Sequence, residues 1–166
     1  IYNYGNLKQQ LNDNQTAIDF YKKALKIEPK NIRVLFTIAH CYQSLGNFEL
    51  AKQNLNKVLE IEPQNTIAHR GISSMTNYSQ NHKHLNEMIN ISKNELLKNT
   101  QKIDLYFALG KAYEDVNDYE NAFINISKAN KIKKDNLNFN IVKEEDNFNR
   151  IIHFFDNFDF DKSLQT

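Results

Sequence analysis

Hydrophobic residues recur along the chain at intervals of three and four, with polar residues between them. One such stripe joins Leu85, Met88 and Ile89, and another joins Ile141, Phe148, Ile151, Ile152 and Phe155. This spacing places apolar side chains on one face of an α-helix. The chain has only four glycines and two prolines, so it has few residues for tight turns, which disfavours a β-sandwich or barrel. The pattern predicts an all-α protein.

The helical pattern repeats. Pro29 and Pro63 close nearly identical stretches that lie 34 residues apart. Counted from these prolines, small residues recur at positions 8, 20 and 27 of a 34-residue unit: Gly5, Ala17 and Ala24; Ala39 and Ala51; Gly110, Ala122 and Ala129. Large residues recur at positions 4, 11, 17 and 24. Small residues let two helices approach and large ones fill the grooves between them, so each unit predicts a packed helix pair that can end at proline.

This unit resembles the tetratricopeptide repeat, a 34-residue helix–turn–helix motif. The resemblance covers residues 1–136 and divides them into a partial first repeat (1–31), a second (32–65), a degenerate third (66–102) and a fourth (103–136). It implies an all-α, right-handed superhelix (α-solenoid) of three to four helix pairs. In the third repeat Ser73, Leu85, Ser92 and Leu97 replace the usual residues. We expect its helices at about residues 67–78 and 84–98.

Residues 137–166 are predicted to form a capping helix and a connector to a further domain. The apolar stripe from about 140 to 157 suits a cap, because a solenoid must cover its last apolar face. The chain starts at Ile1 rather than Met, so we expect it to be a segment of a longer protein. Asp13, Asn47 and Asp118 stand where a side chain can cap the second helix of a pair.

The resemblance implies that positions 2, 5, 9, 12 and 13 of each repeat line a concave groove. The candidate binding residues are Tyr2, Asn6, Arg33, Phe36, His40, Arg70, Tyr78, Asp104, Phe107, Lys111 and Glu114. Such a groove can hold an extended peptide or a helix; the alternative is a groove filled by the protein's own cap or next domain. Chaperone-binding members clamp a C-terminal carboxylate at fixed positions, of which only Asn6 matches here, so no carboxylate clamp is expected.

Charge and composition exclude several other partners. The chain carries 21 Lys and Arg against 20 Asp and Glu, a net charge of +1, so no strong field draws it to nucleic acid or to an anionic membrane. No apolar run approaches the length of a membrane span, and no basic-then-apolar leader is present. We expect a cytoplasmic protein that binds a protein or peptide. Uncovered helix faces also predict some self-association of this segment.

No set of residues points to catalysis, a metal or a cofactor. The glycines are isolated, whereas a phosphate-binding loop needs them clustered. His40 and Cys41 are neighbours on a helix and point about 100° apart, so Cys41 is expected to pack rather than react. One cysteine provides neither a disulfide nor a cysteine zinc site. The run from His82 to His84 is expected to be a polar turn, and the chain itself is not expected to be an enzyme.

A second resemblance concerns residues 85–158. The run 105–115, the segment 118–123 and the pair Ala129-Asn130 precede a basic stretch, Lys131 to Lys134. This is similar to the last repeat and connector of bacterial proteins that join tetratricopeptide repeats to a sulfotransferase domain. It implies a non-catalytic N-terminal region that positions an acceptor or partner, because the phosphosulfate-binding loop of that family is not among these residues. The alternative is a free-standing adaptor.

Overall fold

The computed structural model describes residues 1–79, 82–136 and 141–156. Within these ranges every regular element is an α-helix: α1 (Tyr2–Gln10), α2 (Asn14–Ile27), α3 (Ile32–Ser44), α4 (Phe48–Ile61), α5 (Thr66–Ser74), α6 (Lys83–Ser92), α7 (Asn99–Asp115), α8 (Tyr119–Asn136) and α9 (Ile141–Asp156). The predicted all-α fold is confirmed. The chain divides into two compact units, residues 1–132 and 133–166, and each is described by itself.

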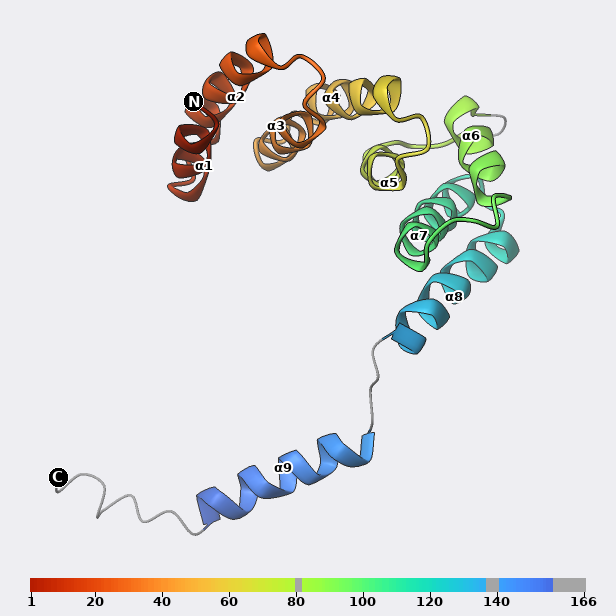
Figure 1. The fold of residues 1–166 in the computed structure, drawn as a ribbon. Coiled ribbons are helices and arrows are strands. Elements are labelled where there is room, and N and C mark those ends of the chain that lie inside the picture. The colour runs from red at the N-terminus through yellow and green to blue at the C-terminus, as the bar shows by residue number, and fades with distance from the viewer. Residues whose placement is uncertain (80–81, 137–140, 157–166) are drawn as a thin grey trace, which may run out of the picture. The chain divides into compact units, whose positions relative to one another are not determined.

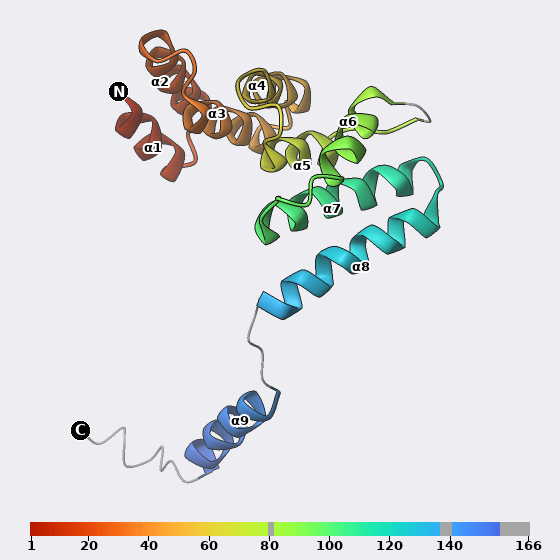
Figure 2. The same ribbon diagram turned by 45° about the vertical axis from the view of Figure 1, so that its right-hand side comes forward.

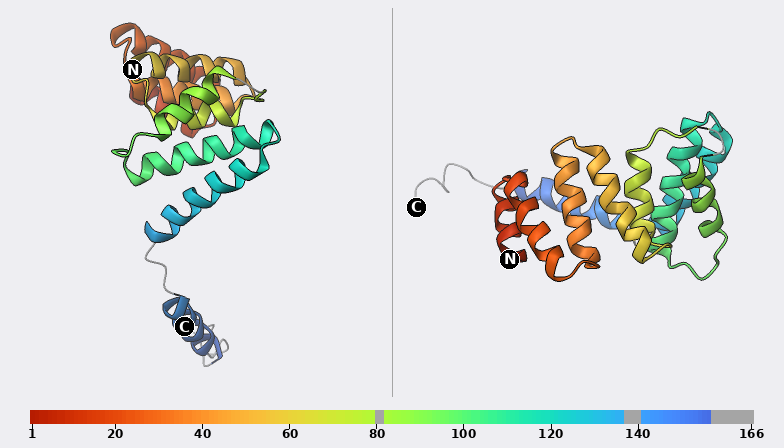
Figure 3. Two further views of the ribbon diagram at one scale, coloured as in Figure 1. Left: turned by 90° about the vertical axis from the view of Figure 1, so that its right-hand side faces the viewer. Right: turned by 90° about the horizontal axis from the view of Figure 1, so that it is seen from above.

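The first unit is a stack of helix pairs (Figure 1). Helix α2 packs on α3 and α4 on α5, so each pair contacts the next, while α5 also packs on α7. Within this unit α1, α3, α5 and α7 follow the inner side of the curve, and α2, α4 and α6 follow the outer side (Figures 1 and 2). Seen from above, the helices of successive pairs stand side by side (Figure 3). We call the first set the inner layer.

Small residues allow close packing within the pairs, as their spacing predicts. Ala17, Ala39 and Ala51 are fully buried. Gly5 faces the ring of Tyr21 so closely that a Cβ there would lie 2.4 Å from ring atom Cε1. A residue larger than glycine would therefore force α1 away from α2.

Most helix starts are capped by the side chain of the preceding polar residue. Asp13 accepts a hydrogen bond from the backbone of Thr16 at 3.2 Å, which confirms its predicted role. Asp118 likewise accepts from the backbone N–H of Asn121 at 3.1 Å. Asn47 makes no such bond, so the prediction was wrong there. The first helices of the second and third pairs are capped by two further asparagines, Asn31 and Asn65.

The helices of the third pair are shorter than expected. Helix α5 ends at Ser74 rather than near 78, and α6 ends at Ser92 rather than near 98. Asn94 explains the second difference: its side-chain oxygen accepts from the backbone of Leu96 at 3.0 Å, a local bond that competes with helical bonding. The next helix then begins at Asn99, four residues before the predicted repeat boundary.

The predicted helix near the C-terminal end is present as α9, and its apolar residues, among them Phe148 and Phe155, are exposed. Its role as a cap stays a prediction. Of the predicted capping helix and connector, residues 137–140 and 157–166 lie outside the described residues. Among the helices that the structure describes, none is both long enough and apolar enough to cross a membrane.

Candidate functional site

The candidate site is the surface of the inner layer, to which α1, α3, α5 and α7 each contribute one face. Ten of the eleven predicted residues lie on these four helices, and Tyr78 does not. Lys111 contacts the segment after α5. The remaining nine keep part of their surface exposed: Tyr2, Asn6, Arg33, Phe36, His40, Arg70, Asp104, Phe107 and Glu114. We call this set the inner surface. The other two predicted residues, Tyr78 and Lys111, are held in a separate network.

Side chains of α1 and α3 meet across the first part of the inner surface. The Tyr2 hydroxyl lies 3.5 Å from Thr37 Oγ1, and Gln9 Nε2 lies 3.2 Å from His40 Nδ1. The imidazole of His40 is otherwise exposed. These contacts join one repeat to the next and fix the polar groups that the two helices present.

The second helix of the first pair supports this surface from behind. The Tyr21 hydroxyl donates to Asn6 Oδ1 at 2.9 Å, which orients the amide of Asn6 on α1. Phe36 on α3 is half-buried and packs against the hydrophobic core. Arg33, one turn earlier on α3, is exposed. The ring of Phe36 and the guanidinium of Arg33 therefore both lie near the start of α3.

The junction of α5 and α7 carries the most ordered group of the inner surface. Arg70 Nη1 donates to Asp104 Oδ1 at 2.8 Å, and the Cζ atom of Arg70 lies 5.1 Å from the centroid of the Phe107 ring. The Arg70 side chain nevertheless remains 50% exposed. Ion pairing and contact with an aromatic face together hold the guanidinium in a defined position.

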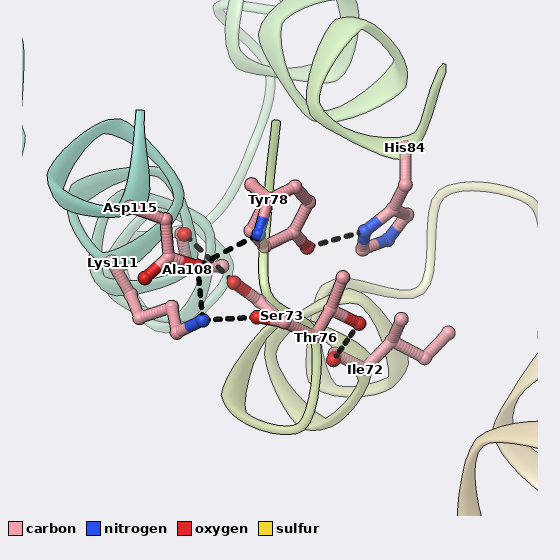
Figure 4. Close-up of polar contacts among 8 residues, drawn as sticks. All are labelled: Ile72, Ser73, Thr76, Tyr78, His84, Ala108, Lys111 and Asp115. Carbon is pink, nitrogen blue, oxygen red and sulfur yellow. Dashed lines mark hydrogen bonds and ion pairs between the residues drawn. The ribbon is translucent and has the colours of Figure 1, made fainter. Parts of the chain in front are cut away.

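Tyr78 does not face the inner surface, which corrects the prediction. It follows the end of α5 instead of extending that helix, and it is only 5% exposed. Its backbone N–H donates to Asp115 Oδ2 on α7 at 2.9 Å, a bond that a longer α5 would not permit (Figure 4). The chain therefore leaves the helix to bond with the next repeat.

Lys111 also makes its contacts within the fold. Its ammonium contacts Asp115 Oδ2 and the carbonyl oxygen of Thr76, and it lies 5.3 Å from the ring centroid of Tyr78 (Figure 4). Three partners surround this one cation. Lys111 therefore anchors the segment after α5 to α7, while Glu114, on the same helix, stays exposed.

Two buried histidines form a network that sequence reasoning missed. His69 Nδ1 lies 2.8 Å from His84 Nε2, His84 Nδ1 lies 2.6 Å from the Tyr78 hydroxyl, and His69 Nε2 lies 2.9 Å from the Pro63 carbonyl oxygen. His69 is 1% and His84 9% exposed. The expected polar turn at 82–84 is thus wrong for His84, which lies within α6. One signal was available: His69 stands at position 4 of its repeat, where large buried residues recur.

Burial controls the protonation of this network. Desolvation, helped by the neighbouring imidazole of His69, lowers the pKa of His84 to about 4. Desolvation also lowers the pKa of His69, and the bond to the Pro63 carbonyl opposes this only in part. Burial raises the pKa of Tyr78 to about 12. At neutral pH both imidazoles are therefore uncharged.

The network is not arranged as a metal site or as a nucleophile. Two nitrogens bound to one tetrahedral zinc would stand about 3.3 Å apart, whereas the 2.8 Å between His69 and His84 fits a hydrogen bond. Throughout the described ranges, no three His, Cys, Asp or Glu residues come together in a way that could hold a metal. Cys41 is fully buried, and burial raises the pKa of its thiol. That disfavours the reactive thiolate.

Comparison with known proteins agrees with this fold. Models of the tetratricopeptide repeat match residues 9–73 and 103–136. An uncharacterized protein of Aquifex aeolicus is 24% identical over 74% of this chain and 16% of its own length. Sperm-associated antigen 1 of Rattus norvegicus is 28% identical over 72% of this chain and 13% of its own length. The chain therefore spans less than a fifth of each of these relatives.

A solved structure of a MamA double mutant, RS-1 ArsTM, superposes with a TM-score of 0.62 at 18% identity, covering 83% of this chain and 76% of that one. This likeness concerns the fold alone. The helix pairs, their small-residue contacts and the two matched ranges, which together cover more than half of the residues, agree with one another. The chain belongs to the tetratricopeptide repeat family.

Proposed function

We propose that this chain is a protein-binding module whose inner surface holds an extended or helical segment of a partner protein. The inner layer presents aromatic, amide and charged side chains from four alternate helices, α1, α3, α5 and α7. Contacts between neighbouring helices already hold several of them, so a partner would meet a preformed surface, and little conformational entropy is lost on binding. Tetratricopeptide repeats as a class are expected to serve such interactions, which supports the proposal.

The proposal rests on the contacts and the solvent exposure of Arg70. Asp104 takes one of its donors and Phe107 covers one face of the guanidinium, yet half of the side chain is open to solvent. A guanidinium has five N–H donors, so several remain for a carboxylate or for backbone carbonyls of a partner. Arginine and aromatic residues are the types that most often dominate binding energy at interfaces.

The test begins with a phage-displayed library of random peptides selected against the 166-residue chain. Dissociation constants of enriched peptides are then measured by fluorescence polarisation. We expect Arg70→Ala, Phe36→Ala and Phe107→Ala each to weaken binding by about tenfold or more, because each removes an anchor of this surface. The matched control is Lys57→Ala, which removes an exposed side chain from α4 on the outer side. Binding that is unchanged in all three inner-surface variants would refute the proposal.

The finer assignment, to a region that places an acceptor beside a sulfotransferase domain, rests on the resemblance of residues 85–158 alone. The competing assignment is a free-standing adaptor. Reading the gene beyond Thr166 separates them. A predicted strand followed by a loop rich in Gly, Ser and Thr supports the enzyme-linked protein, whereas a stop codon supports the adaptor.

A further inference from the structure

When both imidazoles are neutral, only one assignment of donors and acceptors satisfies the hydrogen bonds around His69 and His84. The Pro63 carbonyl can only accept, so His69 Nε2 carries the hydrogen and His69 Nδ1 accepts from His84 Nε2. His84 Nδ1 is then left to accept from the Tyr78 hydroxyl. Both rings are therefore assigned the Nε2–H tautomer, and every polar atom of the network has a partner.

Added protons disturb this arrangement in two steps. A first proton places a charge on rings that are almost completely removed from water. A second proton puts an N–H on both His69 Nδ1 and His84 Nε2, which lie 2.8 Å apart. At that distance two N–H donors on two positively charged rings repel each other, so the doubly protonated pair must separate.

The charged groups around the pair do not supply a ready counter-ion. Helix α4 presents Glu49, Lys52 and Glu60; α6 presents His82, Lys83 and Glu87; α7 presents Lys111 and Asp115. Three of these carboxylates already pair with lysines: Glu49 with Lys52, Glu87 with Lys83, and Asp115 with Lys111. Glu87 stabilises charged His69 only in part. Proton uptake therefore remains costly while the pair is closed.

Protons can nevertheless reach the pair. A groove of about 890 Å³ lies between α4 and α6, and both His69 and His84 line it together with Ile72 of α5. Both histidine side chains therefore lie at the wall of this groove. Any loosening of α6 from α5 exposes the ring nitrogens to solvent at once.

We propose that the packing of α6 against α5 depends on protonation. These two helices, which we call the joint, stay packed while His69 and His84 are neutral. They separate when the pair of histidines takes up two protons, while α1 to α4 stay folded. The short lengths of these helices favour local opening. Helix α5 has nine residues and α6 has ten, and isolated helices of this size are marginal in water. The pair is held instead by the contacts of a few buried side chains, among them the two imidazoles.

Opening of the joint would also displace residues of the inner surface, because Arg70 lies on α5. His69 precedes Arg70 directly in the sequence, and Tyr78 lies beside Lys111 and Asp115 of α7. A displaced α5 therefore changes the position of Arg70 relative to Asp104. This consequence for partner binding rests on the proposed function, but the joint itself does not.

The test is hydrogen exchange of the full chain at pH 7 and at about pH 4.5, expressed as protection factors so that intrinsic exchange rates cancel. We expect amides of α5 and α6 to lose at least about 100-fold in protection, because each histidine of the open state binds a proton near the ordinary pKa of about 6.5 and the closed pair does not. Amides of α3 and α4 should keep their protection. Equal losses in all helices would show global acid unfolding and overturn the joint, as would unchanged protection in α5 and α6.

Two further measurements keep the test independent of any folding defect. Nitrogen-15 shifts of the imidazoles at pH 7 should show the Nε2–H tautomer in both His69 and His84; a cation or an Nδ1–H form would overturn the assignment. His84→Gln keeps one donor and one acceptor but cannot titrate, so its α6 protection should depend less on pH. His153→Gln, at an exposed position of α9, is the matched control and should leave the pH dependence of α6 protection unchanged. No partner is needed, so failure here is distinct from failure of the binding proposal.

Discussion

Replacing Gly5 with alanine tests how closely the first helix pair is packed. The added Cβ would lie 2.4, 2.7 and 2.9 Å from three ring atoms of Tyr21. That ring is fully buried, and its hydroxyl donates to Asn6 and lies 3.0 Å from Gln9 Oε1. The ring therefore cannot turn aside without giving up its hydrogen bond.

The expected size of the effect follows from two opposing contributions. Alanine favours a helix over glycine by about 1 kcal/mol. Overpacking costs about 1–3 kcal/mol, and weakening the Tyr21 hydrogen bond adds about 1 kcal/mol. We expect Gly5→Ala to lower the free energy of unfolding by about 1–3 kcal/mol, read from urea titrations followed by circular dichroism.

Gly71→Ala is the matched control, since Gly71 also lies within a helix. A Cβ at Gly71 would approach one atom, Cδ1 of Leu55, at 2.7 Å. That methyl is the end of a flexible side chain and can move by rotation, so the gain in helix propensity roughly cancels the cost. If Gly5→Ala proved as stable as Gly71→Ala, the argument from the pinned Tyr21 ring would be refuted.

Three more predictions concern single side chains. Asn65→Ala should lower stability by about 1 kcal/mol in thermal unfolding, because Asn65 Oδ1 accepts a hydrogen bond of 3.0 Å from the backbone N–H of Ala68 and so caps α5. Asn47→Ala should cost only about a few tenths of a kcal/mol, because Asn47 makes no such bond. Ser73→Ala should cost about 1 kcal/mol in urea unfolding, since it removes a buried bond of 2.9 Å to the Ala108 carbonyl; a change below a few tenths would contradict this. The pKa of His84 is about 4 when folded and 6.5 when exposed, so the unfolded chain binds more protons between these values. Unfolding free energy should therefore fall as pH drops through this window, by about 3 kcal/mol from this group, and His84→Gln should lack that part of the slope in urea titrations across pH.

The repeat register explains why most of the fold could be predicted from sequence. Pro29 and Pro63 set the period, and the small residues counted from them fall where helices touch, as Ala17 and Gly5 illustrate. A repeat contacts only its neighbours, so a local pattern determines most of the packing. Helix ends were less predictable, because they depend on single side-chain bonds such as those of Asn94 and Tyr78.

The candidate site was predictable to the extent that the register held. In the second and fourth repeats, Phe36, His40, Asp104 and Phe107 belong to helices α3 and α7 of the inner layer, and their part in binding stays a prediction. In the third repeat the mapping failed at Tyr78, because position 13 no longer belongs to a helix there. The sequence shows that this repeat is degenerate, but it does not show where the chain goes once the helix stops.

Polar residues at buried register positions follow a rule that joins these observations. In the second and third repeats positions 4 and 8 are buried, so a polar residue there must find a hydrogen-bond partner. Ser73, at position 8, bonds to Ala108 in the next repeat, 35 residues away. His69, at position 4, bonds instead within its own repeat, to His84. The register thus predicts that a partner exists, and only the fold determines whether it comes from the same repeat or the next. That choice brings two imidazoles together in the third repeat, where we propose that helix packing depends on protonation.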